Sequence, residues 1–190
     1  DDDDPLLGAE FRDPDCNGLY LIEIISAGGS HSCGIDISGS VHCWGDDSVG
    51  QSSPPSGNFV QVSAGHSHNC GIDIGGFVHC WGDDSVGKSS PPNGSFVQVS
   101  AGYNNGCSID TIGEIHCWGY DEERLVSDVP TGIFLEVSAG AHHSCGIDID
   151  GVVQCWGNDN YGQVSDAPSG NFVQVSSGAW HSCGLDISGT

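Results

Sequence analysis

The sequence contains no methionine and very few basic residues. Three Lys and Arg residues stand against 26 Asp and Glu residues, which gives a formal net charge of -23. Because such a surface repels phosphate groups, nucleic acid and anionic membranes are excluded as partners. The sequence starts at Asp1, which we interpret as a processed mature chain or a piece of a longer one.

Long apolar runs are also missing. No stretch approaches the roughly 20 apolar residues of a membrane-spanning helix, so we expect no membrane insertion. No signal-peptide core is present either. The ten regularly spaced cysteines favour an oxidising compartment. Together these features predict a secreted chain whose signal peptide has been removed.

A unit of 37 or 38 residues repeats along most of the chain. Repeats of this length form solenoids, propellers or arrays, in which each unit buries its apolar surface against its neighbours. The first cysteine of each unit is Cys33, Cys70, Cys107, Cys145 or Cys183, and a second one follows ten residues later at Cys43, Cys80, Cys117 and Cys155. We assign the units to residues 19–58, 59–95, 96–133, 134–171 and 172–190 of one repeat domain (19–190).

Residues 1–18 do not share the repeat pattern. They are acidic and contain two prolines, so we interpret them as an N-terminal arm. The arm is either a solvated tail or a segment that completes another part of the fold.

Each unit begins with a short apolar strand, and a hairpin that carries the cysteines follows it. In the first hairpin, Gly39 ends a three-residue loop and is predicted to be left-handed. Counting outward from this loop places Cys33 opposite Cys43 at a non-hydrogen-bonded pair, with Cα atoms about 4.5 Å apart. This distance suits a disulfide. Gly76, Gly113 and Gly151 recur in the same place, which predicts the further disulfides Cys70–Cys80, Cys107–Cys117 and Cys145–Cys155.

Two cysteines remain without a partner in this scheme, Cys16 and Cys183. We predict that they pair with each other. Within one chain the bond closes a ring, which is the arrangement we favour, and between chains it joins copies head to tail into a filament. Zinc binding by the paired cysteines is the alternative to disulfides, but zinc sites favour cysteines separated by two residues.

The unit resembles the repeat of the regulator of chromosome condensation family. The resemblance rests on an apolar strand, Ser-Ala-Gly, His-x-Cys, a glycine turn and Val-x-Cys-Trp-Gly, and it covers residues 19–190. It implies an all-β fold, a β-propeller in which each repeat forms a blade of about four antiparallel strands. Family members commonly have seven blades, whereas this chain has about five units. Family functions include nucleotide exchange on a small GTPase and β-lactamase inhibition, so the fold alone does not select one.

Three hairpins place an Asp and a His diagonally on one face. The pairs are Asp36 with His42, Asp73 with His79, and Asp110 with His116, while Gln154 replaces the His beside Asp148. An Asp, a His and a nearby Ser fit a hydrolase, which we keep as a weak alternative. Because the pair recurs, we favour structural hydrogen bonds between blades, and we predict no catalytic residue and no enzyme.

Two other polar series are candidate metal ligands. A second His series, with Asn105 in the third unit, comprises His31, His68, His143 and His181, and structural hydrogen bonds explain it better than a metal. Acidic pairs after Trp-Gly offer weak calcium candidates at Asp46, Asp47, Asp83 and Asp84, but they lack the spacing of a calcium loop. We predict no resident metal and no cofactor.

Surface function is expected where the unit varies. The turns after the first strand differ between units and hold the possible binding residues His66, Tyr103, Asn104, His142 and Trp180. The tryptophans of the Trp-Gly pairs fit the blade core instead. Asn93 starts a glycosylation sequon.

We therefore expect a non-enzymatic extracellular structural or interaction module, stabilised by disulfides, that binds a protein partner or self-associates through its arm. The alternative is a propeller that binds a protein or a glycan through its variable turns.

Overall fold

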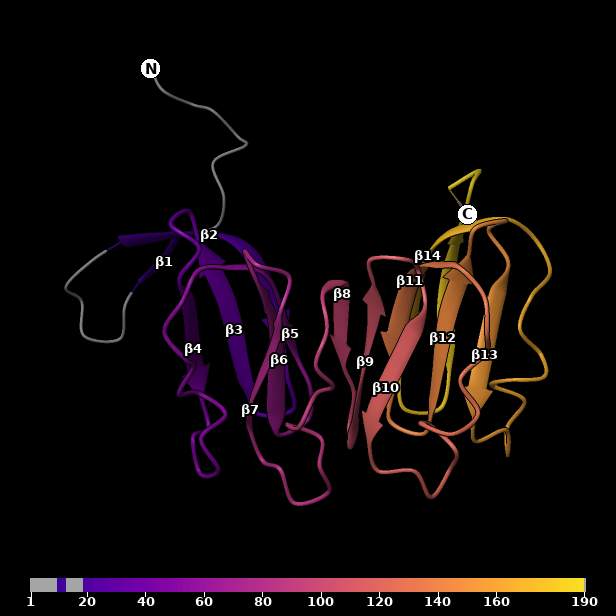
Figure 1. Ribbon diagram of the computed structural model, residues 1–190, viewed down its shortest axis with the longest axis horizontal. Coiled ribbons are helices and arrows are strands. Elements are labelled where there is room, and N and C mark those ends of the chain that lie inside the picture. The colour runs from indigo at the N-terminus through magenta and orange to yellow at the C-terminus, as the bar shows by residue number, and fades with distance from the viewer. Residues whose placement is uncertain (1–9, 13–18, 190) are drawn as a thin grey trace.

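The computed structural model describes residues 10–12 and 19–189, in which every regular element is a β-strand (Figure 1). The strands form five antiparallel sheets in chain order, which we call blades 1 to 5. None of the described residues forms a helix that is long and apolar enough to cross a membrane.

Blade 1 contains β1 (Glu10–Arg12), β2 (Leu19–Ala27), β3 (His31–Asp36) and β4 (Val41–Gly45). Blade 2 contains β5 (Phe59–Ala64), β6 (His68–Asp73) and β7 (Val78–Gly82), and blade 3 contains β8 (Phe96–Ala101), β9 (Asn105–Asp110) and β10 (Ile115–Gly119). Blade 4 contains β11 (Phe134–Ala139), β12 (His143–Asp148) and β13 (Val153–Gly157), and blade 5 contains β14 (Phe172–Ser177) and β15 (Ser182–Asp186).

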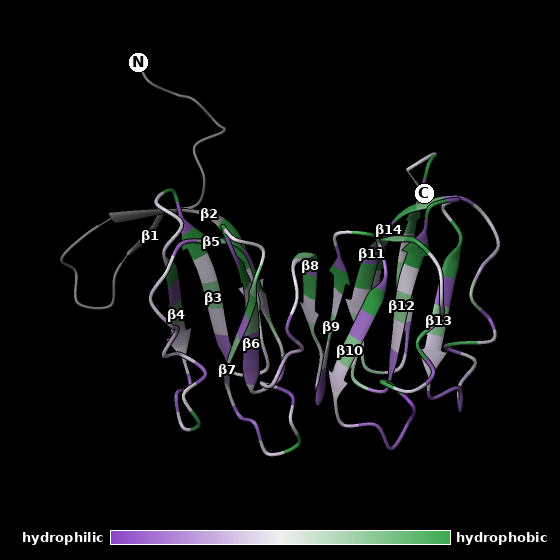
Figure 2. Cartoon of the chain, in the orientation of Figure 1, coloured by the Kyte–Doolittle hydropathy of each residue, from purple (hydrophilic) through white to green (hydrophobic). Residues whose placement is uncertain are grey.

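Blades 2 to 4 have three strands each, not the four that the family resemblance implies. The residues after each Trp-Gly pair are rich in Ser, Pro, Gly and Asp, and they form polar turns that lead to the next blade. Figure 2 shows these loops as largely hydrophilic along the lower side of the molecule.

Blade 1 gains a fourth strand from the N-terminal arm. β1 pairs antiparallel with β2, and Phe11 lies opposite Tyr20. The interpretation of the arm as a solvated tail is therefore wrong for Glu10–Arg12, which complete blade 1. Cys16 lies outside the described residues, so its pairing with Cys183 stays a prediction.

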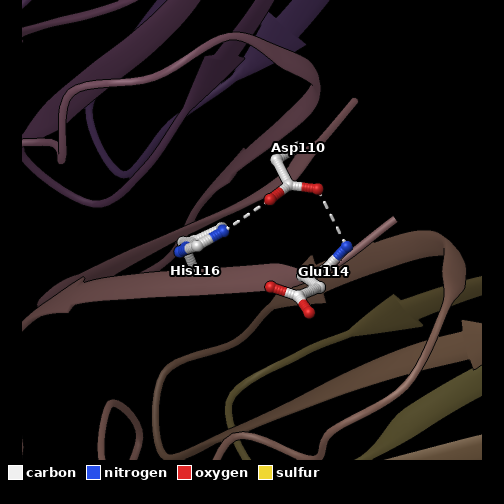
Figure 3. A group of neighbouring side chains, drawn as sticks. All are labelled: Asp110, Glu114 and His116. Carbon is white, nitrogen blue, oxygen red and sulfur yellow. Dashed lines mark hydrogen bonds and ion pairs between the residues drawn. The ribbon is translucent and has the colours of Figure 1, made fainter. Parts of the chain in front are cut away.

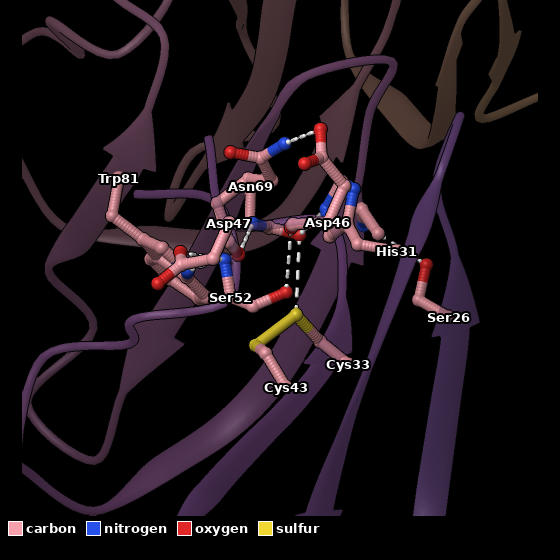
Figure 4. Close-up of a disulfide and its surroundings, with 11 residues drawn as sticks. Ser26, His31, Cys33, Cys43, Asp46, Asp47, Ser52, Asn69 and Trp81 are labelled. Atoms are coloured by element: carbon pink, nitrogen blue, oxygen red, sulfur yellow. Dashed lines mark hydrogen bonds between the residues drawn. A yellow bond between two sulfur atoms is a disulfide. The ribbon is translucent and has the colours of Figure 1, made fainter. Parts of the chain in front are cut away.

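The hairpins have the register that was derived from the glycine loop. Gly39 has a φ of 85°, and Cys33 lies opposite Cys43. The two cysteines form a disulfide with a Cα–Cα distance of 4.1 Å (Figure 4). Equivalent disulfides join Cys70 to Cys80, Cys107 to Cys117, and Cys145 to Cys155.

The hydrophobic core lies between consecutive blades. The disulfide face of the first hairpin, with Cys33 and Ile35, packs against Phe59, Val62 and Trp81 of blade 2. The same arrangement recurs between blades 2 and 3 and between blades 3 and 4, where Trp118 and Trp156 fill the position of Trp81. Each unit thus buries its apolar face against its neighbour, as expected for a repeat protein.

Each of these tryptophans also makes a hydrogen bond to the loop of the preceding blade. The indole Nε1–H of Trp81 donates to the backbone carbonyl of Gln51 over 3.2 Å, and those of Trp118 and Trp156 donate to Lys88 over 2.9 Å and to Leu125 over 3.0 Å. A buried indole therefore has its polar group satisfied as well as its apolar surface covered.

The five blades curve around an axis lined by the ends of their first strands. Backbone hydrogen bonds link neighbouring blades there, from Gly29 to Gly65, His66 to Gly102, Tyr103 to Gly140 and Ala141 to Gly178. Glycine is needed because the next blade approaches closely: a Cβ on Gly65 would lie 2.4 Å from the carbonyl oxygen of Gly102.

The described blades form an open arc. The first strands pack side by side from β2 to β14, and no packing of similar extent joins β14 to β2. Figure 1 places blade 1 on the left and β14 in the right half of the molecule, beside β11 and β12. Closure of the blades into a five-bladed ring, which we favour over a filament, stays a prediction.

Buried imidazoles connect the blades near the same axis. His31 and His143 each form a hydrogen bond with a side chain of the next blade, to Asn69 over 2.7 Å and to Ser182 over 2.6 Å. The equivalent neighbour of His68 is Gly106, which has no side chain, and neither ring nitrogen of the fully buried His68 has a side-chain partner. Burial, and secondarily the positive charge of Lys88, lowers the pKa of His68 to about 4.

Because Trp81 packs between blades 1 and 2, we expect truncation of its side chain to destabilise the protein strongly. We expect Trp81→Ala to lower the free energy of unfolding by about 3–5 kcal/mol, because it opens a cavity between blades 1 and 2. Trp44→Ala is the control, since Trp44 is only partly buried and has no described blade before it. Urea unfolding of both variants tests this, and equal losses would contradict the assignment of the core to the blade interfaces.

The low pKa of His68 predicts a specific pH dependence. The unfolded chain binds a proton at this residue below about pH 6.5, whereas the folded chain does so only below about 4. The free energy of unfolding should therefore fall by on the order of 2–3 kcal/mol as the pH drops through this window.

His68→Asn should remove that part of the dependence, because Asn105 occupies the same buried position in blade 3. Stability curves of both proteins between pH 7 and 4 measure the difference. Parallel curves would show that His68 does not resist protonation.

Candidate functional site

The variable turns lie together at one end of the blades, beside the axis. They connect the first strand of each blade to the second, and the register places His31 opposite Gly45, so the turns share this end with the Trp-Gly pairs. In Figure 1 this is the lower side, where β4 and β10 end.

Five aromatic side chains from these turns and one adjoining loop form what we call the aromatic rim: His66, Tyr103, His142, Tyr161 and Trp180. The His66 ring lies 4.2 Å from the Tyr103 ring, between the turns of blades 2 and 3. The His142 ring stacks on Trp180 at 3.8 Å, between blades 4 and 5, and Tyr161 meets Trp180 edge-on at 5.3 Å.

Four of the five rim residues are exposed to solvent, and His142 is half-buried. Tyr161 is 74% exposed, Trp180 44% and Tyr103 43%. Large aromatic side chains that stay exposed on a rigid framework are typical of recognition surfaces. The structure thus brings four of the five residues predicted for binding into two neighbouring pairs.

An acidic side chain holds one of these pairs in place. Glu123 accepts a hydrogen bond from the Nδ1 atom of His142 over 2.8 Å and another from the Nδ2–H of Asn158 over 3.2 Å. Glu123 belongs to the irregular loop of the third unit, and in the first unit Val49 occupies its position. The irregular loop therefore adds a charge next to the stacked rings.

Asn104, the fifth predicted binding residue, has a structural partner. Its side-chain oxygen accepts a hydrogen bond over 3.1 Å from the buried ammonium group of Lys88. The same ammonium group bonds Ser67 over 2.9 Å and lies 2.7 Å from the carboxylate of Asp83. Asn104 therefore helps to satisfy a buried charge.

Sequence reasoning missed Tyr161 and Glu123. Tyr161 replaces the valines that stand at its position in the first two units, and an aromatic residue in a polar loop was an available signal. No signal in the sequence indicates the role of Glu123, because its contact with His142 depends on how the loop of blade 3 approaches the turn of blade 4.

The rim borders an opening at the axis. A hollow of about 230 Å³ is lined by the Ala and Gly ends of all five first strands and by His66 and Tyr103. Its walls carry almost no functional groups, so the chemistry of this face comes from the rim.

The recurring Asp and His residues meet as predicted. His42, His79 and His116 each place Nε2 2.8 Å from the carboxylate of their Asp, and Gln154 donates to Asp148 over 2.9 Å. The contacts lie within single blades and not between them, because each His and its Asp belong to the same hairpin. His79 also packs on Phe59 of its own sheet.

The same carboxylates also cap the hairpin loops. Asp36 accepts hydrogen bonds from the backbone N–H groups of Ser38 and Ser40. Burial by itself would raise its pKa, but hydrogen bonds from Ser38, His42 and Ser40 lower the pKa to about 2. A carboxylate with these partners stabilises a turn, and its recurrence supports the structural interpretation.

One hairpin adds a second carboxylate to the pair. Glu114 joins Asp110 and His116 within 4.8 Å, the one such group of three in the described part of the chain (Figure 3). Two oxygen acceptor positions of Asp110 are already used by the N–H groups of Ile112 and Glu114, and Glu114 is exposed. These contacts explain the cluster without a metal.

The weak calcium candidates are likewise engaged in their own loops. Asp46 accepts hydrogen bonds from Ser48 and Gln51. Asp47 and Asp84 each accept hydrogen bonds from the serines five and six residues further along the chain. Asp83 accepts a hydrogen bond from Ser85 and forms an ion pair with Lys88. The Lys88 ammonium group, followed by the N–H of Ser85, lowers the pKa of Asp83 to about 2. A cation already occupies the place that calcium would take there.

Asn93 is exposed in the loop between β7 and β8. Its position is compatible with glycosylation, which stays a prediction.

Comparisons with known proteins agree with the repeat pattern. The family model described as the regulator of chromosome condensation (RCC1) repeat matches residues 22–51, 96–123 and 134–163. A comparison with curated protein sequences gives no match.

Solved structures resemble the whole arc. The chain is 26% identical to the entire ectodomain of the Physcomitrella patens receptor kinase CR4, with a TM-score of 0.78 over 88% of this chain and 50% of that chain. It is 28% identical to the CRINKLY WD40 ectodomain of the Arabidopsis thaliana receptor kinase ACR4, with a TM-score of 0.73 over 88% of this chain and 60% of that chain.

Yeast RCC1 (Prp20), solved bound to Kap60, is 16% identical, with a TM-score of 0.75 over 93% of this chain and 56% of that chain, and at this identity it shows the fold alone. The chain spans about half to three-fifths of the length of these structures. Repeat pattern, family match and fold agree that the chain contains repeats of the regulator of chromosome condensation (RCC1) type, at residues 22–51, 96–123 and 134–163.

Proposed function

We propose that the chain is an extracellular, non-enzymatic interaction module that binds a protein partner through the aromatic rim. The observation that carries this proposal is the stack of His142 on Trp180 with Tyr161 at its edge. Exposed aromatic residues of this kind are the usual anchors of protein interfaces.

Two findings support the extracellular placement. Four disulfides lie within the repeats, and such bonds persist in oxidising compartments. Two similar structures, at 26% and 28% identity, are receptor ectodomains.

The charge of the molecule indicates the chemistry of the partner. A formal charge of -23 attracts a basic surface, and Glu123 places a carboxylate beside the rim. A Lys or Arg side chain of the partner would contact the face of Trp180 and the nearby carboxylate together. The proposed partner is therefore a basic protein segment.

Loss of the central ring should abolish binding. Trp180→Ala is expected to weaken the captured complex by at least about thirty-fold, because a central aromatic anchor contributes about 2 kcal/mol or more. Val97→Ala, which truncates a side chain that is 63% exposed on blade 3, is the matched control.

Affinity capture from extracellular fluid with the wild-type chain and both variants, followed by measurement of the affinity for the purified partner, tests this prediction. A glycan array run with the same proteins separates the alternatives. Binding that Trp180→Ala leaves intact, or binding to glycans alone, would contradict the proposal.

Self-association is the second candidate function, and the two ends of the arc favour it. Ile25 of blade 1 occupies the position of Val62, yet it is 54% exposed where Val62 is 5% exposed. At the other end, blade 5 exposes Gln174, whose counterpart Gln61 accepts the N–H of Val99 from the next blade. In the described part of the chain, Ile25 and Gln174 thus expose two surfaces that neighbouring blades cover elsewhere, and a second copy that covers them would form a head-to-tail contact.

A charge at one end face should block this association. We expect the wild-type chain to associate with rising concentration in sedimentation velocity runs, and Ile25→Glu to stay monomeric. Val60→Glu is the control, because Val60 is also 54% exposed but does not face a neighbouring blade position. A wild-type chain that is monomeric at all concentrations would rule out this function.

A further inference from the structure

Blade 2 has a backbone edge that no other strand covers in the described part of the chain. Its last strand, β7, pairs with β6 alone. The N–H of Asp73 donates to the carbonyl of Phe77 over 3.0 Å, and hydrogen-bonded pairs alternate along the hairpin from there. The N–H and C=O groups of Val78 and Cys80 therefore point away from β6. None of the described residues forms a hydrogen bond with these groups, so the edge can pair with a further strand.

A groove follows this edge. It has a volume of about 390 Å³ and is lined by four consecutive residues of β7 (78–81), by Ser53 and Pro55 from the loop of blade 1, and by Ser89 and Pro91 from the loop of blade 2. Because successive side chains of a strand point to opposite faces, this lining means that the groove runs along the backbone of β7, between the two loops. The prolines have no N–H group to offer to the edge. The groove therefore has the shape that an added strand requires.

The walls of the groove are acidic. Asp47 in the loop of blade 1 and Asp84 in the loop of blade 2 are exposed, and each accepts a hydrogen bond over 2.8 Å from a serine of its own loop. The one basic residue in these two loops (46–58 and 83–95) is Lys88, which is buried and already paired with a carboxylate. Since no exposed cation of the loops balances the two carboxylates, the groove attracts a basic ligand.

We propose that the edge of β7 binds a basic extended segment of another protein, which adds to blade 2 as a fourth strand. Strand addition gains its affinity from backbone hydrogen bonds, and the flanking side chains give it selectivity. The outward backbone groups of Val78 and Cys80 pair with the segment, while its Lys or Arg side chains contact the walls at Asp47 and Asp84. None of the residues that line the groove belongs to the aromatic rim, so this site does not depend on the proposed function.

The first test uses the peptide RVRVRV with acetylated and amidated ends. Two further versions carry N-methyl groups, one on its Val residues and the other on its Arg residues. Because the N–H groups of a strand alternate between its two edges, one set faces β7 and the other faces solvent. All three peptides have the same charge, so the comparison isolates the backbone hydrogen bonds.

We expect the unmodified peptide and one methylated version to bind the wild-type chain in titration calorimetry at about 0.15 M salt, which screens long-range attraction. The other methylated version should bind about tenfold more weakly or worse, which corresponds to about 1.4 kcal/mol. Equal affinities of the two methylated versions, or no binding of the unmodified peptide, would overturn the proposal.

A matched pair of variants tests whether the peptide lies in the groove. Ser53 and Ser90 occupy the same position in consecutive units, and each donates to an Asp of its own loop over 2.8 Å, but Ser53 lines the groove and Ser90 does not. Ser53→Arg brings a cation and a large side chain into the groove and should weaken binding by about tenfold or more, whereas Ser90→Arg should change it less than about threefold. Equal effects of the two substitutions would refute the site.

Trp180→Ala separates the groove from the rim. It should leave the affinity for the peptide unchanged, because Trp180 does not line the groove. Loss of binding in this variant would mean that the peptide binds the rim, and it would refute the strand site without contradicting the proposed function.

Amide exchange of the unmodified chain, resolved by residue, locates the added strand. The N–H groups of Val78 and Cys80 should exchange about tenfold more slowly or less at saturating peptide, because they then donate to its carbonyl groups. Cys117, the counterpart of Cys80 in blade 3, is the internal control and should not change. Unchanged exchange at Val78 and Cys80, or equal slowing at Cys117, would contradict the proposal.

Discussion

The structure depends on one contact that recurs along the chain, in which the disulfide face of a hairpin packs against a phenylalanine, a valine and a tryptophan of the next blade. Cys33, Ile35 and Trp81 show it between blades 1 and 2. A single repeat of this kind cannot bury its apolar face by itself, so its stability depends on the neighbouring blades. The disulfide stiffens the hairpin from within, and the indole joins it to its neighbour.

This contact explains why the sequence predicts the fold so well. The steps between cysteines and the glycine at the end of each loop determine the register, and the disulfides follow from it. Local geometry is sufficient to predict each disulfide, because Gly39, Cys33 and Cys43 all lie within one hairpin. The inter-blade burial of Trp81 follows as well, since repeats of this length cover their apolar faces only by stacking.

Features that join distant parts of the chain were less accessible from the sequence. The arm that contains Glu10–Arg12 was left open between a solvated tail and a segment that completes the fold, because its residues do not follow the repeat. The choice between a closed ring and an open arrangement was also left open, because the curvature depends on how closely the glycines of neighbouring blades approach. In the rim, His142 and Trp180 were predicted as separate binding residues, but their stacking needs the two turns to lie side by side.

Comparison of the repeat units also separates structural positions from functional ones. Where the unit is constant, its polar residues cap loops or join blades, as Asp36 and His31 do. Where it varies, side chains such as Tyr103 and Trp180 are exposed and meet rings of a neighbouring blade, and this difference directs the functional proposal to the rim.

Hydrogen exchange of the native chain, followed by mass spectrometry, tests the dependence on blade contacts most directly. The slowest exchange is expected in β6 and β9, which lie in blades whose two neighbours each have three or more described strands, and clearly faster exchange is expected in β15. Protection of β15 equal to that of β9 would contradict it, because the blades would then be stable without the recurring tryptophan contact.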